Sequence, residues 1–323
     1  MIKLKHPENN SVICIATQKQ LEYLNMDRRN LQGDSIDWLN LERRAKDDDT
    51  FPLSVKFVWE CDRIASLVIS ETEDFEDFRI VRGDKTCTVI NLKAGTRYFW
   101  KVKCGNEESD VFFFETENIL PRWIYVDGLT NVRDCGGWMT DSGKKVKQGL
   151  LYRGSELNSH VTITDSGLKT MREDLKIKTV LDIRGSTEIV KDIYKGGYVN
   201  IPVKAYGDYI DEPEQNRKIF EFLSDETNYP VYFHCWGGAD RTGTIAFLLN
   251  AFLGVGEKDL IDDYEITTLS IWGVRSRNTD LFRSLIEKID EFKGETLKQK
   301  VENFMLESGV TKEQIESIRR IFL

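Results

Sequence analysis

The segment VYFHCWGGADRTGT, residues 231–244, constrains the fold of this chain more than any other stretch. Apolar and aromatic residues precede His234 and Cys235, and a glycine-rich turn then leads to Arg241 and the apolar run TGTIAFLLNAFLGV. This order predicts a buried strand, a tight loop and a buried helix, which together form one unit of an α/β layer structure. A Cys-x5-Arg spacing by itself is common, but the same spacing between such a strand and such a helix is rare.

Residues 119–323 alternate strand and helix patterns. KTVLDIRG and YPVYFHC are apolar strand runs, and several amphipathic segments follow the glycine-rich turn. Near the C-terminal end, Gly309 is a helix stop, and Thr311 with Gln314 has the spacing of a capping box. We therefore expect an α/β domain with a central, mostly parallel sheet flanked by helices.

Residues 1–118 show a different pattern. Between residues 53 and 117, short runs of alternating apolar and polar residues are separated by polar or glycine turns, which predicts an all-β sandwich. In the run TRYFWKVKC, alternate residues from Tyr98 to Cys104 share one face. The leucine, turn and T-x-Y-x-W-x-V pattern resembles the corner of fibronectin type III domains at which a tyrosine pins the turn. Residues 17–50 lack strand patterning, so we expect them to form a helical insertion in this domain.

Composition excludes several classes of protein. The net charge of −9 and the pI near 5.2 argue against nucleic-acid binding. No apolar run is long enough to span a bilayer, and the start of the chain has no apolar signal segment, so we expect a cytoplasmic protein. The six cysteines show no metal or disulfide spacing and are expected to be free thiols. With only three histidines, we expect no metal site, and nothing indicates a cofactor.

The five residues between Cys235 and Arg241 suit a phosphate. A tight loop can point successive backbone N–H groups inward as an anion nest, and Gly237, Gly238 and Ala239 permit the curvature. The helix expected to start near residue 242 directs its positive end into the same loop. The Arg241 guanidinium can bind two phosphate oxygens at once.

The same environment favours an anionic sulfur at Cys235, and the thiolate is the nucleophilic form of cysteine. Attack on phosphorus would give a phosphocysteine that water then hydrolyses. We expect the hydroxyl of Thr242 to donate to the thiolate and His234 to orient the loop through the backbone. The alternative for Cys235 is a buried core residue without chemistry.

A leaving alkoxide or phenoxide needs a proton, and Asp240 inside the loop is the first candidate for the general acid. Its alternative role is to brace the loop by hydrogen bonding. Asp208 and Asp211, in a segment expected to form a flap, are the second choices, and each has the alternative role of a turn or N-cap residue.

The span from about 121 to 323 resembles the bacterial atypical protein-tyrosine and lipid phosphatases of the dual-specificity-like group. The resemblance rests on NVRDCGG, GLLYRGSEL, KTVLDIRGSTEI and HCWGGADRTG, which occur in the order of that family's motifs. It implies that Cys235 is the nucleophile, Arg241 the phosphate-binding arginine and Asp240 the in-loop acid. It also places Asp182 and Arg184 as a strand-end pair beside the site.

Two further pairs are expected outside the chemistry. Arg133 and Asp134 match the family's N-x-R-D segment and are expected to hold it in place. Arg275 and Arg277 are expected on a solvated helix face, with the pocket rim as the alternative.

The resemblance implies a phosphatase, and one departure bears on its substrate. Lipid-active members place lysine directly before the loop aspartate, whereas this chain has Ala239. We therefore favour phosphotyrosine in a peptide or protein, with Trp236 as a wall for the aromatic ring or as packing under the loop. An inositol phosphate, a phosphoinositide or another small phosphomonoester is the alternative substrate, and a non-catalytic phosphate-binding module is the alternative class.

Overall fold

The computed structural model describes residues 2–28, 48–185 and 193–323. Contacts divide the chain into two compact units. The first comprises Met1–Thr17 and Pro52–Arg122, and the second comprises Gln18–Phe51 and Trp123–Leu323. The chain therefore passes from the first unit into the second, returns, and enters the second again.

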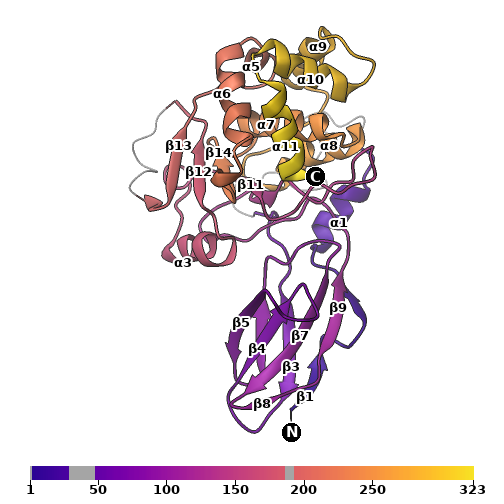
Figure 1. Cartoon of the computed structure of the whole chain (residues 1–323), viewed down its shortest axis with the longest axis vertical. Coiled ribbons are helices and arrows are strands. Elements are labelled where there is room, and N and C mark those ends of the chain that lie inside the picture. Colours follow the sequence, from indigo (N-terminus) through magenta and orange to yellow (C-terminus); the bar gives the residue numbers. More distant parts are fainter. Residues whose placement is uncertain (1, 29–47, 186–192) are drawn as a thin grey trace. The chain divides into compact units, whose positions relative to one another are not determined.

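The first unit contains two sheets (Figure 1). Alternation along the strands directs one side of each sheet inward, as in β3, where Val55, Phe57 and Trp59 are buried between exposed or half-buried neighbours. Buried residues of both sheets form one hydrophobic cluster. The first sheet has the order β1 (Lys3–His6), β3 (Val55–Glu60), β6 (Thr86–Val89). The second has the order β2 (Ser11–Ile13), β9 (Phe112–Thr116), β7 (Arg97–Cys104), β4 (Ala65–Ser70), β5 (Phe78–Gly83), with β8 (Glu107–Glu108) paired to β7.

A tyrosine stabilises the turn before β7. The hydroxyl of Tyr98 accepts a hydrogen bond of 2.7 Å from the backbone N–H of Lys93. The ring of Tyr98 stacks on Phe114 in the core, which holds the hydroxyl at the turn. This is the contact expected of a fibronectin type III corner; the assignment of the unit to that fold, and the boundary at residue 118, stay predictions.

Residues 18–51 belong by their contacts to the second unit, whereas the sequence placed them in the first domain. Helix α1 (Gln18–Asn25) carries Tyr23, whose hydroxyl donates to the carbonyl of Glu265 at 2.8 Å. Just after the helix, the buried guanidinium of Arg28 pairs with Asp262. Buried polar contacts of this kind leave no mark in the pattern of hydrophobic residues. The sequence therefore suggested that this polar helix is an insertion in the first domain. The expected helical residues 29–47 lie outside the described residues.

The second unit is an α/β domain (Figure 1). Its sheet has the order β10-β11-β14-β12-β13. The four strands from β11 to β13 are parallel, and only β10 is antiparallel. The expected α/β architecture with a mostly parallel sheet is therefore found in this unit. The strands are β10 (Arg133–Asp134), β11 (Leu151–Gly154), β12 (Thr179–Asp182), β13 (Gly197–Asn200) and β14 (Val231–His234).

Helices cover this sheet, and α7 (Asp240–Leu253) is buried along nearly its whole length, as its apolar run predicts. The expected capping box at Thr311 is confirmed, with Gln314 as its partner. None of the helices within the described ranges is both long enough and apolar enough to span a bilayer. The other α-helices of the described residues are α3 (Asp165–Lys169), α5 (Gly207–Ile210), α6 (Pro213–Leu223), α8 (Glu257–Glu265), α9 (Asp280–Asp290), α10 (Leu297–Glu307) and α11 (Lys312–Phe322). The described part of the unit also contains the short helical segments η3 (Thr170–Asp174), η4 (Glu226–Asn228) and η5 (Ile266–Leu269).

Candidate active site

The loop that starts at Cys235 lies where three parallel strands end together. In the register of the sheet, His234 at the end of β14 pairs with Gly154 of β11 on one side and with Asp182 of β12 on the other. β14 comes last along the chain but sits between two earlier strands, so the carboxyl ends of β11, β12 and β14 form a switch point of the sheet. Ligands of parallel α/β sheets bind in this position.

Every carbonyl of the loop from residue 235 to residue 239 is bound by a donor outside the loop. The four donors make five contacts and come from different parts of the second unit, so the loop is held from its outer side. The contacts are His234 Nδ1 to Cys235 O at 2.9 Å, Glu156 N to Trp236 O at 2.8 Å, Asn131 Nδ2 to Gly237 O at 2.9 Å, and Arg153 Nη2 to Gly238 O at 2.8 Å and Ala239 O at 3.4 Å.

The outward carbonyls fix the direction of the amides. In a planar trans peptide the C=O and the following N–H point in opposite directions, so the N–H groups of residues 236–240 face the inside of the loop. Among the described residues, no group accepts a hydrogen bond from the amides of residues 236–242. The last of these belong to the first turn of α7, whose positive end adds to the same field. The loop is thus a cup of unpaired donors suited to an anion.

Two glycines permit this shape. Gly238 has φ +67°, and a Cβ on it would stand 2.3 Å from the carbonyl oxygen of Gly154. A Cβ on Gly237 would lie 2.6 Å from the indole of Trp272. Neither position accommodates a side chain without moving the loop or its neighbour.

Behind the loop, two buried arginines share one carboxylate. Arg153 Nη1 donates to Asp263 at 2.6 Å, and Arg133 Nε donates to the other oxygen of Asp263 at 2.7 Å. Burial lowers the pKa of Arg133 to about 10, although Asp263 opposes the shift. Arg133 Nη1 also donates to Asn131 Oδ1, and Asn131 Nδ2 donates to the carbonyl of Gly237. The network of buried charges is therefore connected to the loop by hydrogen bonds. Arg133 has the structural role expected of it.

Asp134 has a structural place as well. Its two carboxylate oxygens accept from the N–H groups of Gly136, at 2.8 Å, and Gly149, at 2.6 Å. These two bonds connect the N-x-R-D segment with the residues just before strand β11.

The predicted nucleophile and its neighbours lie at the base and rim of the cup. Cys235 is 3% exposed and follows β14 directly. The Thr242 hydroxyl is fully buried and has no hydrogen-bond partner among the described residues, so it keeps a donor for the loop interior. Arg241 is half-buried and makes no hydrogen bond or ion pair within those residues. Its guanidinium therefore keeps its five donors for an anion.

His234 is buried at the end of β14. Because a carbonyl only accepts, its contact with the Cys235 carbonyl requires a proton on Nδ1, while Nε2 has no partner in the described part of the chain. Burial lowers the pKa of His234 even though Asp182 lies 4.0 Å away and opposes the shift. The ring therefore donates to the backbone of the loop, and its role in orienting the loop stays a prediction.

Asp182 and Arg184 form the expected pair at the end of β12. Asp182 accepts from Arg184 Nε at 3.0 Å and Nη2 at 2.9 Å, and Arg184 Nη1 lies 3.5 Å from Glu156. The guanidinium of Arg184 stacks 4.6 Å from the centroid of the Trp236 ring. Burial opposes the charge of Arg184, but Asp182 outweighs it and raises the pKa. The half-buried Trp236 also contacts the ring of His160 edge-on, at 5.0 Å.

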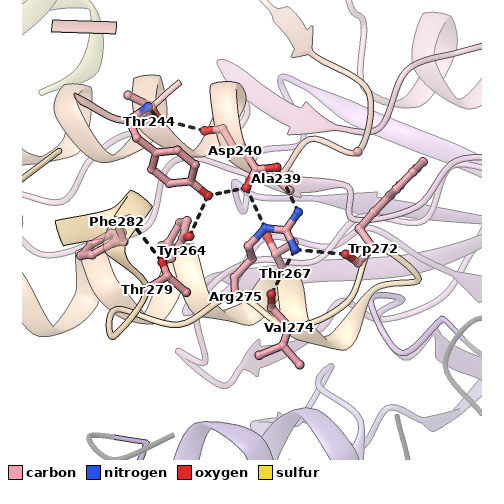
Figure 2. Close-up of polar contacts among 12 residues, drawn as sticks. Ala239, Asp240, Thr244, Tyr264, Thr267, Trp272, Val274, Arg275, Thr279 and Phe282 are labelled. Atoms are coloured by element: carbon pink, nitrogen blue, oxygen red, sulfur yellow. Dashed lines mark hydrogen bonds and ion pairs between the residues drawn. The ribbon is translucent and has the colours of Figure 1, made fainter. Parts of the chain in front are cut away.

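Asp240 is held by an arginine that the sequence placed elsewhere. Figure 2 shows the Arg275 guanidinium facing the carboxylate of Asp240. Arg275 Nε lies 2.7 Å from Oδ1, and Nη2 lies 3.0 Å from Oδ2. The Tyr206 hydroxyl donates to Oδ1 and also contacts the Tyr264 hydroxyl at 2.8 Å. Burial works to raise the pKa of Asp240, but the bonds and charge of Arg275, aided by Tyr206 and Arg241, lower it. The general-acid role needs the protonated carboxyl, and this arrangement favours the carboxylate.

The other acid candidates lie in the segment at α5. Asp208 belongs to α5 and is exposed, and Asp211 forms an ion pair with Lys288 at 2.5 Å. Neither contacts a residue of the 235–241 loop through a hydrogen bond or ion pair between described residues.

The expectation of a solvated helix face at residues 275 and 277 is wrong. Neither residue is in a helix, and both guanidinium groups bind carboxylates: Arg275 binds Asp240, and Arg277 binds Glu265 at 2.8 Å.

Sequence reasoning also missed Arg153, Asn131 and Glu156, which hold the loop carbonyls. Arg275 and Arg277 lie in the segment WGVRSRNT, which is rich in turn residues and has no helical periodicity. This pattern was the available sign that the two arginines are not on a helix.

No cluster of three or more His, Cys, Asp or Glu suited to a metal ion occurs in residues 2–28, 48–185 and 193–323.

Comparisons with known proteins bear on the second unit. A candidate tyrosine-protein phosphatase of Cupriavidus necator is 27% identical over 174 residues, which cover 43% of this chain and 60% of that protein. The solved core catalytic domain of the PP-IP phosphatase SIW14 from S. cerevisiae, in complex with citrate, is 18% identical, covers 42% of this chain and 79% of that chain, and has a TM-score of 0.34. A second structure of the Siw14 catalytic core is 15% identical, covers 46% and 83%, and has a TM-score of 0.33. Residues 124–323 match the profile described as "Tyrosine phosphatase family", and since they make up more than half of the sequence, the chain belongs to that family.

Proposed function

We propose that this chain is a protein-tyrosine phosphatase that hydrolyses phosphotyrosine through a phosphocysteine formed at Cys235. The observation that carries the proposal is the loop of residues 235–241, whose five carbonyls are bound on the outside and whose amides face inward. Phosphoric monoester hydrolysis is the reaction class of the tyrosine phosphatase family, and an inward ring of amides above a cysteine suits a tetrahedral phosphate.

In the first step the phosphate binds in the cup. Its oxygens accept from the amides of residues 236–241, and the Arg241 guanidinium binds two of them as a fork. The amides and Arg241 stabilise negative charge at the centre of the loop, which favours the anionic sulfur of Cys235. The sulfur attacks phosphorus, the S–P bond forms, and the P–O bond to the leaving group breaks with its electron pair on oxygen.

In the second step water hydrolyses the phosphocysteine. Asp240 is the loop carboxylate available to accept a proton from that water. The S–P bond breaks, inorganic phosphate leaves, and the sulfur returns to its anionic form. We propose that the Thr242 hydroxyl, buried and without a partner among the described residues, donates to this sulfur.

The rim of the loop favours an aromatic substrate. Trp236 is half-buried, and its ring is fixed by Arg184 on its face and by His160 at its edge. A tyrosine ring entering beside the phosphate can pack on this wall. Ala239 stands where a lysine would add a cation for a more highly charged substrate, which weighs against inositol phosphates and phosphoinositides.

For the first unit we propose a fibronectin type III-like β-sandwich over residues 1–118, before a phosphatase domain over residues 119–323. The contact of Tyr98 with the Lys93 amide supports this assignment. Its two sheets share a hydrophobic core of their own, which suits an independent domain.

Steady-state hydrolysis of p-nitrophenyl phosphate tests the proposed function. Cys235→Ser and Arg241→Ala are expected to lower kcat/KM by roughly 10³-fold or more, since each removes a part of a cooperative site. Cys87→Ser, at a half-buried cysteine of the first unit, serves as the matched control and is expected to keep the full rate. A Cys235→Ser variant as active as the wild type would refute the assignment.

A further inference from the structure

One outer contact of the loop of residues 235–241 is made by the side chain of Asn131. Its Nδ2 donates to the carbonyl of Gly237 at 2.9 Å, and the residue is fully buried. The peptide plane that carries this carbonyl also carries the N–H of Gly238, so the position of Asn131 sets the direction of that N–H. Any group that holds Asn131 in place therefore acts on the loop.

Asn131 is held in an unfavourable backbone conformation. Its φ is +58°, in the left-handed region that few residues other than glycine adopt, although asparagine tolerates it better than most. Such a conformation persists where the surroundings fix it. Arg133 Nη1 fixes the side chain by donating to Asn131 Oδ1 at 2.6 Å. Thr50 fixes the main chain, because its hydroxyl oxygen accepts from the N–H of Asn131 at 2.9 Å, across 81 residues of the sequence.

The hydroxyl of Thr50 is oriented to accept this hydrogen bond. It donates its proton to Asp48 Oδ1 at 2.5 Å, and the same carboxylate oxygen accepts from the backbone N–H of Thr50 at 2.9 Å. A hydroxyl has one donor and two lone pairs, so donation to Asp48 leaves the lone pairs for Asn131. Thr50 is 1% exposed, so solvent has no access from which water could replace the contact.

The backbone on both sides of Thr50 is bound to the second unit. The N–H of Asp49 donates to the carbonyl of Leu269 at 3.0 Å. The buried Gln20 donates from Nε2 to the carbonyls of Asp49, at 2.8 Å, and Phe51, at 2.9 Å. These contacts fix the position of Thr50 before it binds Asn131.

We propose that Thr50 is a positioning residue that acts through Asn131 on Gly237 and so keeps the loop in the shape that binds phosphate. The inference rests on the proposed function in taking phosphate as the ligand of the loop. The family match covers residues 124–323, so Thr50 belongs to a segment outside the matched part of the chain. The catalytic unit thus extends beyond the proposed domain of residues 119–323.

The experiment measures the Kd of inorganic phosphate for the full chain by calorimetry, together with thermal unfolding without phosphate. Thr50→Val removes the hydroxyl and keeps the shape of the side chain, so the N–H of Asn131 loses its acceptor. The Kd is expected to rise by about 10-fold, because donors that are displaced from a common centre bind the anion less well. A role confined to packing would lower the unfolding temperature and leave the Kd unchanged. Thr50→Ser restores the hydroxyl and is expected to bring the Kd back to within about 2-fold of the wild type.

Thr227→Val is the matched control. Thr227 donates from its hydroxyl and from its N–H to Oδ1 of Asp225, two residues before it, as Thr50 does to Asp48. Thr227 is exposed in the short helical segment η4 and makes no hydrogen bond to Asn131 within the described ranges. The same substitution there is expected to leave the Kd for phosphate unchanged.

Asn131→Gly tests the route from Thr50 to the loop. Glycine adopts a positive φ readily, but it lacks the amide that binds Gly237. In this background Thr50→Val is expected to change the Kd by less than about 2-fold, because the two residues act in series and their effects do not add.

A folded Thr50→Val variant that binds phosphate as the wild type does would overturn the inference, and so would an undiminished effect of Thr50→Val in the Asn131→Gly background. If Thr50→Val does not fold, Thr50→Ala replaces it, and the same results decide. Phosphate binding that depends on Thr50, without turnover of p-nitrophenyl phosphate by the wild type, would support the inference and count against the proposed function alone.

Discussion

Arg153 donates from Nη2 to the carbonyl oxygen of Gly238 at 2.8 Å, while its Nη1 donates to the buried carboxylate of Asp263 at 2.6 Å. One side chain at the end of β11 thus orients a peptide of the loop and neutralises a buried charge behind it. Arg133 holds the other oxygen of Asp263, so the position of the loop is tied to a charge network inside the domain.

Replacing Arg153 is therefore expected to cost both stability and activity. Arg153→Met leaves Asp263 with one of its two arginines and frees the Gly238 carbonyl, so we expect a loss of about 3–5 kcal/mol in the free energy of unfolding. Urea unfolding measures the loss, and kcat/KM on p-nitrophenyl phosphate should fall with it. Arg217→Met, which breaks an exposed pair with Glu221, is the control and is expected to cost less than about 1 kcal/mol. Equal stabilities of the two variants would contradict the role of Arg153.

Gly238 is expected to tolerate no side chain. In Gly238→Ala the new Cβ meets the Gly154 carbonyl, so the loop must shift and the amides lose their common focus. Gly143→Ala separates this effect from backbone strain, because Gly143 also has positive φ, at +77°, but has no atom within 4 Å of the Cβ position. We expect both variants to lose about 1–2 kcal/mol from the left-handed backbone. Only Gly238→Ala should also weaken inhibition by inorganic phosphate, and a matching loss in Gly143→Ala would refute the argument.

The buried His234 predicts how stability depends on pH. Burial lowers its folded pKa below the ordinary 6.5, so the unfolded chain binds the proton more readily. The stabilising contribution is complete above pH 6.5 and is lost as the pH falls from there toward the folded pKa, by up to about 1.4 kcal/mol per unit. His234→Asn keeps a donor for the Cys235 carbonyl but does not titrate. When the pH is lowered from 8 to 5.5, the urea midpoint should fall further for the wild type than for His234→Asn. An equal fall in both proteins would contradict this prediction.

The contacts of Arg28 predict that the second unit needs residues before 52. Arg28 is buried against Asp262 and lies 3.8 Å from Glu265, and Tyr23 stacks on its guanidinium. Arg28→Met leaves two carboxylates short of a charge partner, although Lys258 and Arg277 still pair with them, so we expect a loss of about 1–3 kcal/mol. Arg63→Met, at an exposed pair with Glu107 in the first unit, is the control.

Because the contacts of Arg28 and Tyr23 are missing from it, a fragment of residues 119–323 should unfold at a lower temperature than the full chain. A fragment as stable as the full chain would show that the segment is dispensable.

The parts of the site that are local in sequence could be predicted. The strand, the five-residue loop, the glycines and the apolar helix follow one another within residues 231–253, and each has a residue pattern with a direct physical cause. Asp182 and Arg184 were expected as a strand-end pair from the family resemblance, and their contact spans only two residues of the chain.

The contacts that orient the loop could not be predicted, because they join residues that are distant along the chain. Arg275 follows Asp240 by 35 residues, and Arg153 precedes Gly238 by 85. Which arginine reaches which carboxylate depends on how the loops pack on the sheet, and charge patterning in one sequence does not encode that choice. The contacts that lower the pKa of Asp240 come from such a pair, so the sequence could not indicate them.

Trapping the covalent intermediate tests the central claim most directly. The full chain is mixed with excess aryl phosphate, quenched in acid within the first turnover, digested and analysed by mass spectrometry. The account predicts one phosphate on the peptide that contains Cys235, lost on longer incubation without substrate and absent in Cys235→Ser. Rapid release of phenol with no phosphate on that peptide, or with phosphate on another residue, would contradict it.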